Sequence, residues 1–123
     1  MCGICGILNL ENGPPPERDL LTRMMGRLRH RGPDSSGIYR DRRAALGHTR
    51  LEIIDLETGA QPLANEDGSI WIAFNGEIFN YVELSARLRD RGHVFSTQSD
   101  TEIIVHAYEE YGTAFPCPVD RKR

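Results

Sequence analysis

The chain lacks the features that mark several large classes of protein. Its 123 residues include only three cysteines, an odd number with no signal peptide before them, which predicts free thiols and a reducing, cytoplasmic setting rather than a disulfide framework. Basic residues do not exceed acidic ones, and the net charge of -3 provides no positive field for nucleic acid or an anionic membrane surface. The apolar start of the chain, residues 4–10, is too short to span a bilayer. We therefore expect neither nucleic acid nor membrane as a partner.

The sequence also lacks a recognisable metal site. Cys2 and Cys5 have Cys-x-x-Cys spacing, but Cys117 is the only other cysteine and the four histidines show no paired spacing. A thioredoxin-like pair would open a helix, whereas "CGICGILNL" is typical of an extended strand. We expect no metal here, and we interpret Cys5 as a small buried hydrophobic residue.

The predicted elements of the first half are a strand, a helix and a hairpin. Residues 3–10 are apolar without clear alternation, which predicts a strand buried on both faces. Apolar residues at helical spacing predict an amphipathic helix over 17–29, whose last basic residues suit its dipole. A polar loop follows, and residues 37–50 are typical of a hairpin with charges at its tip.

The second half adds a strand and two helices. Residues 65–81 predict a turn and a strand that breaks at Gly76, and a further short strand is expected over "HVFST", residues 93–97. Capping-box spacings, Asn80 with Glu83 and Ser99 with Glu102, predict helices that end at glycines 92 and 112. The order of elements favours an α+β or α/β fold in one domain.

Cys2 stands where a terminal nucleophile can form. A small second residue permits removal of Met1, which leaves a thiol and a free α-amino group on Cys2. That amine has a pKa of about 7.7–8.0, so near neutral pH it can accept the thiol proton without a histidine. The alternative, a chance cysteine at the N-terminus, stays open on this residue alone.

A second candidate feature is "FNGEIFNY", residues 74–81. A strand that stops at Asn75 and Gly76 can direct a side-chain amide and a backbone N–H at one point, as an oxyanion hole requires. Asn-Gly is also a common turn, which is the alternative interpretation. The flanking segments "IWIAF" and "EIF" are apolar enough to be buried themselves, which favours a functional loop over a surface turn.

Three charged residues lie in apolar surroundings. Arg50 can hold a carboxylate with its guanidinium fork, while Glu77 and Asp100 can hold an ammonium group, so together they would fit the α-groups of an amino acid. Each has an alternative: Arg50 as a surface charge, Glu77 as a partner of a helix end, and Asp100 as a helix cap. We interpret His48 and Trp71 as packing residues.

Several long motifs together resemble one known family. In order and spacing, the chain resembles the glutamine amidotransferase domain of the N-terminal-nucleophile type, and within it the glutamine-hydrolysing asparagine synthase family. The motifs are "MCGICGIL", "RHRGPDSSGIY", "LGHTRLEIIDLETGAQPL", "FNGEIFNY" and "QSDTEIIVHAYEEYG".

The resemblance implies a role for each candidate residue. Cys2 would be the nucleophile and its amine the base, and Asn75 and Gly76 would form the oxyanion hole. Arg50 would hold the α-carboxylate of glutamine, and the other substrate-binding residues would be Ile53, Ile54, Glu77 and Asp100. The implied reaction releases ammonia from glutamine through a thioester, without a cofactor.

The resemblance also implies what this chain does not contain. The family fold is an αββα sandwich, which is expected to be incomplete here: residues 1–112 would be a partial glutaminase domain and residues 113–123 a divergent tail. Missing strands would expose sheet edges and apolar surface.

The ATP- and Mg-dependent synthetase half, which amidates aspartate, would be a separate domain or subunit. Two alternatives stay open: an inactive fragment or partner-binding remnant, and a glutaminase that serves a sugar-phosphate or phosphoribosyl acceptor.

Overall fold

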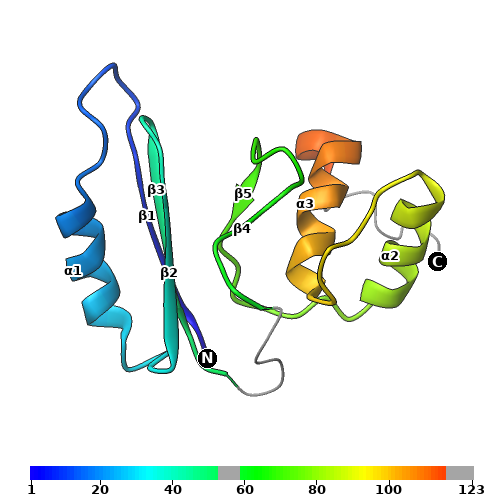
Figure 1. Ribbon diagram of the computed structural model, residues 1–123, viewed down its shortest axis with the longest axis horizontal. Helices are drawn as coiled ribbons and strands as arrows, with labels where there is room; N and C mark the ends of the chain where they lie inside the picture. Colours follow the sequence, from blue (N-terminus) through cyan, green and yellow to red (C-terminus); the bar gives the residue numbers. More distant parts are fainter. Residues whose placement is uncertain (53–58, 116–123) are drawn as a thin grey trace.

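The computed structural model describes residues 1–52 and 59–115 and shows a mixed helix and strand chain (Figure 1). This composition agrees with the predicted α+β class. No helix of these residues is long and apolar enough to cross a membrane. The elements are, in chain order, β1 (Gly3–Leu8), α1 (Arg18–Leu28), β2 (Ser35–Arg40), β3 (Ala44–Arg50), β4 (Leu63–Ala64), β5 (Trp71–Ile72), α2 (Tyr81–Asp90), α3 (Asp100–Tyr111) and the 3₁₀ turn η1 (Gly112–Ala114).

A three-stranded antiparallel sheet forms the first half of the molecule. Its strand order is β1-β3-β2, and β2 and β3 form the predicted hairpin. α1 covers one face, because its apolar stripe packs on the side chains of the strands. The predicted amphipathic helix is thus confirmed. The core on this face consists of Leu21, Met25 and Ala45, with Cys5 and Ile7 packed against it.

The opposite face of this sheet is more open than the sequence predicts. Side chains alternate along β1, so that Ile4 and Leu8 point away from α1, and they are 48% and 66% exposed. The prediction of a strand buried on both faces is therefore wrong within the described residues. The physical reason is the small size of the second sheet, in which β4 and β5 contribute two residues each.

A second apolar core lies between α2 and α3. Both helices end as predicted at glycines with positive φ, Gly92 at 94° and Gly112 at 58°, values that few side chains tolerate. The core residues shared by the two helices are Leu84, Leu88, Ile103 and Ala107.

The two predicted helix starts are correct, but neither capping box forms as a reciprocal pair. Asn80 precedes α2 without a side-chain cap bond. Ser99 caps α3 by accepting from the Thr101 N–H, so the cap is Ser99 and not Asp100. Glu102 does not reach back to Ser99, because its carboxylate binds elsewhere.

The carboxylate of Glu102 explains why "HVFST" is not a strand. Glu102 is buried, and it accepts hydrogen bonds from the backbone N–H groups and the hydroxyls of Ser96 and Thr97. Backbone donors used in this way are not available to a sheet ladder. The predicted strand over residues 93–97 is replaced by an irregular segment folded onto α3.

Across Figure 1 the elements follow one another as α1, the three-stranded sheet, the β4–β5 hairpin, α3 and α2. Tyr39 of β2 stacks on Trp71 of β5, with ring centroids 4.3 Å apart, which confirms Trp71 as a packing residue. Gly37 of β2 approaches the backbone of Gln61 so closely that a Cβ would lie 1.9 Å from the Gln61 carbonyl oxygen. β2 is therefore one of the surfaces that join the two halves.

The close approach at Gly37 tests this packing. Gly37→Ala should lower the free energy of unfolding by about 1–3 kcal/mol, because the new methyl group would overlap backbone atoms. Gly26→Ala, a matched change in α1 with open space around it, should raise the free energy of unfolding by about 0.5–1 kcal/mol. Urea denaturation measures both changes. A Gly37→Ala protein as stable as the unsubstituted chain would contradict the described contact.

Candidate active site

Cys2 lies at the open end of β1, directly before the first strand residue. Gly3 pairs with Thr49, so the antiparallel register continued by one residue places Cys2 opposite Arg50 of β3. A Cβ at Gly3 would lie 2.6 Å from Thr49 Oγ1, which explains why the strand starts with glycine. Arg31 Nε donates to the Cys2 carbonyl oxygen over 3.2 Å. This bond and the adjacent Gly3–Thr49 pairing hold the N-terminal end of β1.

The two described cysteines have different surroundings. Both thiols are free of disulfides, as predicted for them, while Cys117 lies outside the described residues. Cys5 packs against the core under α1, as expected of a small apolar residue. Burial raises the pKa of the Cys5 thiol, and a hydrogen bond from the Gly47 backbone opposes this only in part. Because the thiolate is the reactive form, Cys5 is a poor nucleophile near neutral pH.

A cavity of about 380 Å³ opens beside Arg50. This volume lies at the lower end of the range for small-molecule sites, about 300–1,000 Å³. Arg50 is half-buried, and a Cβ at Gly59 would lie 2.2 Å from its Nη2, so the guanidinium lies directly against the Gly59 backbone. Other residues that line the cavity include Ser35, Gly37, His48, Glu52 and Gln61.

The polar segment after α1 packs on the end of β3. Asp34 N donates to the Arg50 carbonyl oxygen over 3.0 Å, and Asp34 Oδ2 accepts from Glu52 N over 2.8 Å. A Cβ at Gly32 would lie 2.3 Å from a β3 carbonyl oxygen, so only glycine fits there. The segment that carries Arg31 is thereby fixed between β1 and β3.

The tripeptide of residues 75–77 is held between two anchored neighbours. His48 Nε2 lies 3.2 Å from the Phe74 carbonyl oxygen, and Gln61 Oε1 accepts from Phe74 N over 2.7 Å. At the other end, Asp100 Oδ2 accepts from Ile78 N over 3.0 Å. Contacts from β3, from the segment before β4 and from α3 therefore fix the entrance and the exit of this loop.

The loop itself is at the surface. Asn75, Gly76 and Glu77 are all exposed, and the apolar flanks that were predicted to be buried are half-buried except for Trp71 and Phe79, which are exposed. The cause is the early end of β5 at Ile72, beyond which the described residues place no strand beside the loop. The alternative of a hairpin turn also fails, since the hairpin turns at residues 65–70 and Gly76 is not among the described glycines with positive φ.

His48 is the polar centre of the interface between the sheet and the loop. It is 1% exposed, and burial lowers its pKa below the usual 6.5, which the bond to Phe74 opposes and the charge of Arg50 reinforces. The ring is therefore neutral at pH 7 and donates its Nε2 proton to the Phe74 carbonyl. This bond satisfies a polar group that would otherwise be buried without a partner.

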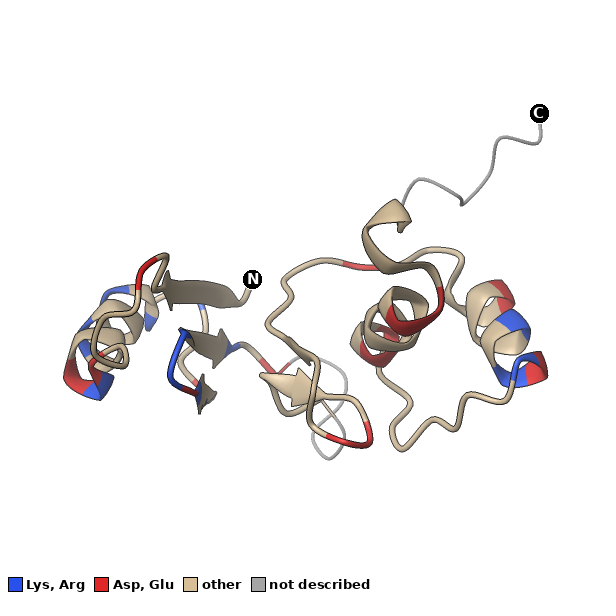
Figure 2. Ribbon diagram, turned by 90° about the horizontal axis from the view of Figure 1, so that it is seen from above, with Lys and Arg blue, Asp and Glu red and all other residues tan. Residues whose placement is uncertain are grey.

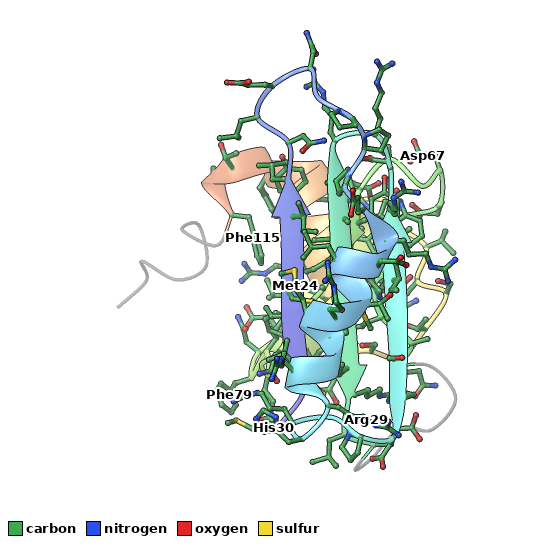
Figure 3. The ribbon with its side chains drawn as sticks, turned by 90° about the vertical axis from the view of Figure 1, so that its left-hand side faces the viewer. Met24, Arg29, His30, Asp67, Phe79 and Phe115 are labelled. Carbon is green, nitrogen blue, oxygen red and sulfur yellow. The ribbon has the colours of Figure 1, made fainter. Side chains whose placement is uncertain are left out.

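The predicted residues are not enclosed in one cavity. The start of β1 and the chain between β5 and α2, which carries the residue 75–77 loop, lie along the same lower edge in Figure 1 but in the left and right halves of the molecule, and Figure 3 shows Phe79 near that edge. The cavity beside Arg50 is not lined by Cys2, Asn75, Gly76, Glu77 or Asp100. The predicted pocket residues Ile53 and Ile54 lie outside the described residues.

Three residues that position the site were missed in the sequence. Arg31 follows the predicted helix of residues 17–29 and was given no role in the site, whereas its side chain binds the Cys2 carbonyl. The sequence predicts only a packing role for His48, and no sequence pattern indicates a role for Gln61. A buried histidine in a strand must find a hydrogen-bond partner, which is the signal that could have identified His48.

The model of the glutamine amidotransferase domain family matches residues 1–118. The chain belongs to this family. Asparagine synthetase 1 (glutamine-hydrolysing) of Bacillus subtilis is 43% identical over 90% of the chain, and the enzyme of that name in Arabidopsis thaliana is 47% identical over 94%. Asparagine synthetase (glutamine-hydrolysing) of Zea mays is 46% identical over 94%. The aligned part is 18–19% of these proteins, so this amidotransferase chain spans about a fifth of their length.

The lowered pKa of His48 predicts how the stability of this amidotransferase chain depends on pH. The pKa of His48 is lower in the folded chain than its value of 6.5 in the unfolded chain, so between these two pH values the unfolded chain binds more protons. The stabilisation by neutral His48 is therefore present above pH 6.5 and is lost as the pH falls through the pKa of the folded chain. His48→Gln keeps a side-chain N–H donor but does not titrate. Urea denaturation from pH 7.5 to 5 should show a shallower loss of stability for His48→Gln than for the unsubstituted chain. If the free energy of unfolding depends on pH in the same way for both proteins, His48 is not neutral and buried as described.

Proposed function

We propose that this chain is the glutamine-hydrolysing part of an asparagine synthetase-type amidotransferase, and that it releases ammonia from the side chain of glutamine. The observation that carries the proposal is the position of Cys2, second in the chain and next to Gly3, whose partner Thr49 precedes Arg50 on β3. The names of the relatives, which describe glutamine-hydrolysing asparagine synthetases, support the same chemistry.

Removal of Met1 would create the nucleophile. Met1 is 75% exposed and precedes the first strand, so a processing peptidase can reach it. The freed amine of Cys2 would take the thiol proton, and Sγ would attack the carboxamide carbon of glutamine. Ammonia would leave with that proton, and water would hydrolyse the resulting thioester to glutamate.

The anchored loop supplies a place for the developing oxyanion. Because Phe74 and Ile78 are both fixed by hydrogen bonds, the Asn75 amide and the Gly76 N–H can be held ready before the substrate arrives. Donors that need no reorganisation are the main source of stabilisation for such an anion. A Cβ at Gly76 would lie 2.7 Å from the Phe74 ring, so a larger residue would disturb this loop.

Charged groups would orient the substrate. Arg50, at the wall of the cavity, would pair with the α-carboxylate of glutamine. Glu77 and the second oxygen of Asp100 would receive the α-ammonium group, and backbone near Ile53 and Ile54 would complete the pocket. The order of layers in Figure 1 fits an αββα sandwich in which the second sheet is represented by the β4–β5 hairpin.

The ammonia would serve a second reaction at a separate site. We assign that reaction to a synthetase segment or subunit that amidates aspartate with ATP and Mg, because the relatives are named asparagine synthetases and extend far beyond the matched region. The glutaminase step itself is proposed to need no cofactor.

A second candidate function has one observation in its favour. Phe79, next to the loop, is 92% exposed, and Ile4 and Leu8 are exposed on the sheet. Apolar side chains of this kind are typical of a surface that packs against further protein. In this alternative the chain by itself is inactive and binds a partner.

The proposal is tested with the 123-residue chain and two matched cysteine variants. We expect ammonia release from glutamine with the unsubstituted chain and with Cys5→Ser, and only background release with Cys2→Ser. An electrophilic glutamine analogue should label Cys2 and spare Cys5, because burial raises the pKa of the Cys5 thiol. Equal labelling of both cysteines, or ammonia release that survives Cys2→Ser, would contradict the proposal. No labelling and no ammonia release at all would favour the partner-binding alternative.

A further inference from the structure

Three potential ligand atoms converge beside the C-terminal half of α3. They are His93 Nδ1, from the segment after α2, and His106 Nδ1 and Glu109 Oε2, both from α3. The two imidazole nitrogens lie 3.2 Å apart. Glu109 Oε2 lies 3.1 Å from His106 Nδ1 and 3.4 Å from His93 Nδ1. The three atoms therefore form a nearly equilateral triangle.

The size of this triangle matches a zinc coordination sphere. Zinc bonds to nitrogen and carboxylate oxygen are about 2.0–2.1 Å long, so the edges of a regular tetrahedron around the ion measure about 3.3–3.4 Å. The three measured separations, 3.1 to 3.4 Å, are close to these edges. Two imidazoles and a carboxylate are also a ligand set that zinc accepts in proteins.

The remaining ring nitrogens are each paired with a carboxylate. His93 Nε2 lies 3.1 Å from Glu110 Oε2, and His106 Nε2 lies 3.4 Å from Glu102 Oε1. Such partners hold the proton on Nε2 and leave the Nδ1 lone pair free for a metal, as in the carboxylate–histidine–zinc arrangements of metalloproteins. In that tautomer two Nδ1 lone pairs and one carboxylate oxygen face one another, and a metal cation at their centre would satisfy all three; the alternative is a proton shared in the His93–His106 and His106–Glu109 hydrogen bonds.

The surroundings of the triangle are acidic. Figure 2 shows acidic and no basic positions on α3, and the turn between β4 and β5 adds Glu66, whose Oε1 lies 3.8 Å from His106 Nδ1. Arg91 pairs with Glu110 and offsets one of these charges. Four carboxylates thus surround the two imidazoles: Glu66, Glu102, Glu109 and Glu110.

Burial indicates which ligand position is open. His106 is 1% exposed, while the side chain of Glu109 is 24% exposed and that of Glu66 is 56% exposed. Asn65 Nδ2 donates to Glu109 Oε1 over 2.6 Å, which leaves Glu109 Oε2 directed at the histidines. The fourth position therefore faces the β4–β5 turn, within reach of Glu66 or a water molecule.

We propose that His93, His106 and Glu109 form a structural zinc site, with Glu66 or water as the fourth ligand. The ion would join three segments: α3, the irregular chain after α2, and the β4–β5 turn. The sequence predicted no metal site because these histidines lie 13 positions apart, without a recognised ligand spacing. The site is independent of glutamine hydrolysis, so its test does not depend on the proposed function.

Zinc binding to the full 123-residue chain provides the test. After treatment with a chelator, the chain should bind one zinc ion by calorimetry and show a higher melting temperature with zinc, while magnesium should have no comparable effect. His93→Gln and Glu109→Gln should each weaken zinc binding by more than about 100-fold, since even outer-shell changes cost about 10–100-fold. His30→Gln, a matched change at an exposed histidine outside the cluster, should bind zinc normally.

Cobalt(II) identifies the ligands and keeps the test valid if a variant folds poorly. The cobalt-loaded chain should show the visible bands of a tetrahedral nitrogen and oxygen site, without the near-ultraviolet charge-transfer band of a thiolate. Circular dichroism should show that His93→Gln remains folded without metal. The proposal is overturned if zinc does not bind, if the thiolate band appears, or if folded His93→Gln and Glu109→Gln bind zinc as tightly as the unsubstituted chain.

Discussion

The hydrogen bond from His48 to the Phe74 carbonyl is the contact on which the proposed site depends. It joins β3, which ends at Arg50, to the residue before Asn75, so it links the carboxylate-binding candidate to the oxyanion-hole candidates. The bond lies between the two halves of the molecule, which also meet where the ring of Tyr39 stacks on that of Trp71. A neutral buried imidazole is well suited to this task, because it donates one hydrogen bond without the cost of burying a charge.

α3 connects the candidate active site to the acidic cluster. Asp100, its first residue, accepts the hydrogen bond that ends the residue 75–77 loop, and Glu109, near its last turn, belongs to the proposed zinc site. Between them, Glu102 fixes the segment that replaces the predicted strand. A single helix therefore sets the positions of two chemically different groups, so the rigidity of α3 bears on both.

Local sequence patterns predicted the elements that depend on neighbouring residues, and failed where burial depends on distant parts of the chain. The apolar stripe of α1, the β2–β3 hairpin and the glycine stops of α2 and α3 depend on neighbouring residues, which the sequence displays directly. The exposed face of β1 and the exposed Asn75 loop depend on how much of a second sheet is present. Apolar composition alone could not reveal that β5 would end at Ile72.

The sequence predicted which residues belong to the candidate site, but not how they are arranged in space. Cys2 and Arg50 were selected for their chemistry, and the two residues next to them, Gly3 and Thr49, pair across β1 and β3. The side chain of Arg31 contacts the Cys2 backbone 29 residues away, and the side chain of Gln61 contacts the Phe74 backbone 13 residues away, so these positioning contacts are not local in sequence.

The most direct test of the account is to trap the thioester. The chain is mixed with glutamine, quenched in acid and digested, and the N-terminal peptide is analysed by mass spectrometry. The account predicts a peptide that begins at Cys2, without Met1, and carries a glutamyl group on that cysteine. A peptide that retains Met1 and carries no glutamyl group, or a glutamyl group found on Cys5, would contradict it.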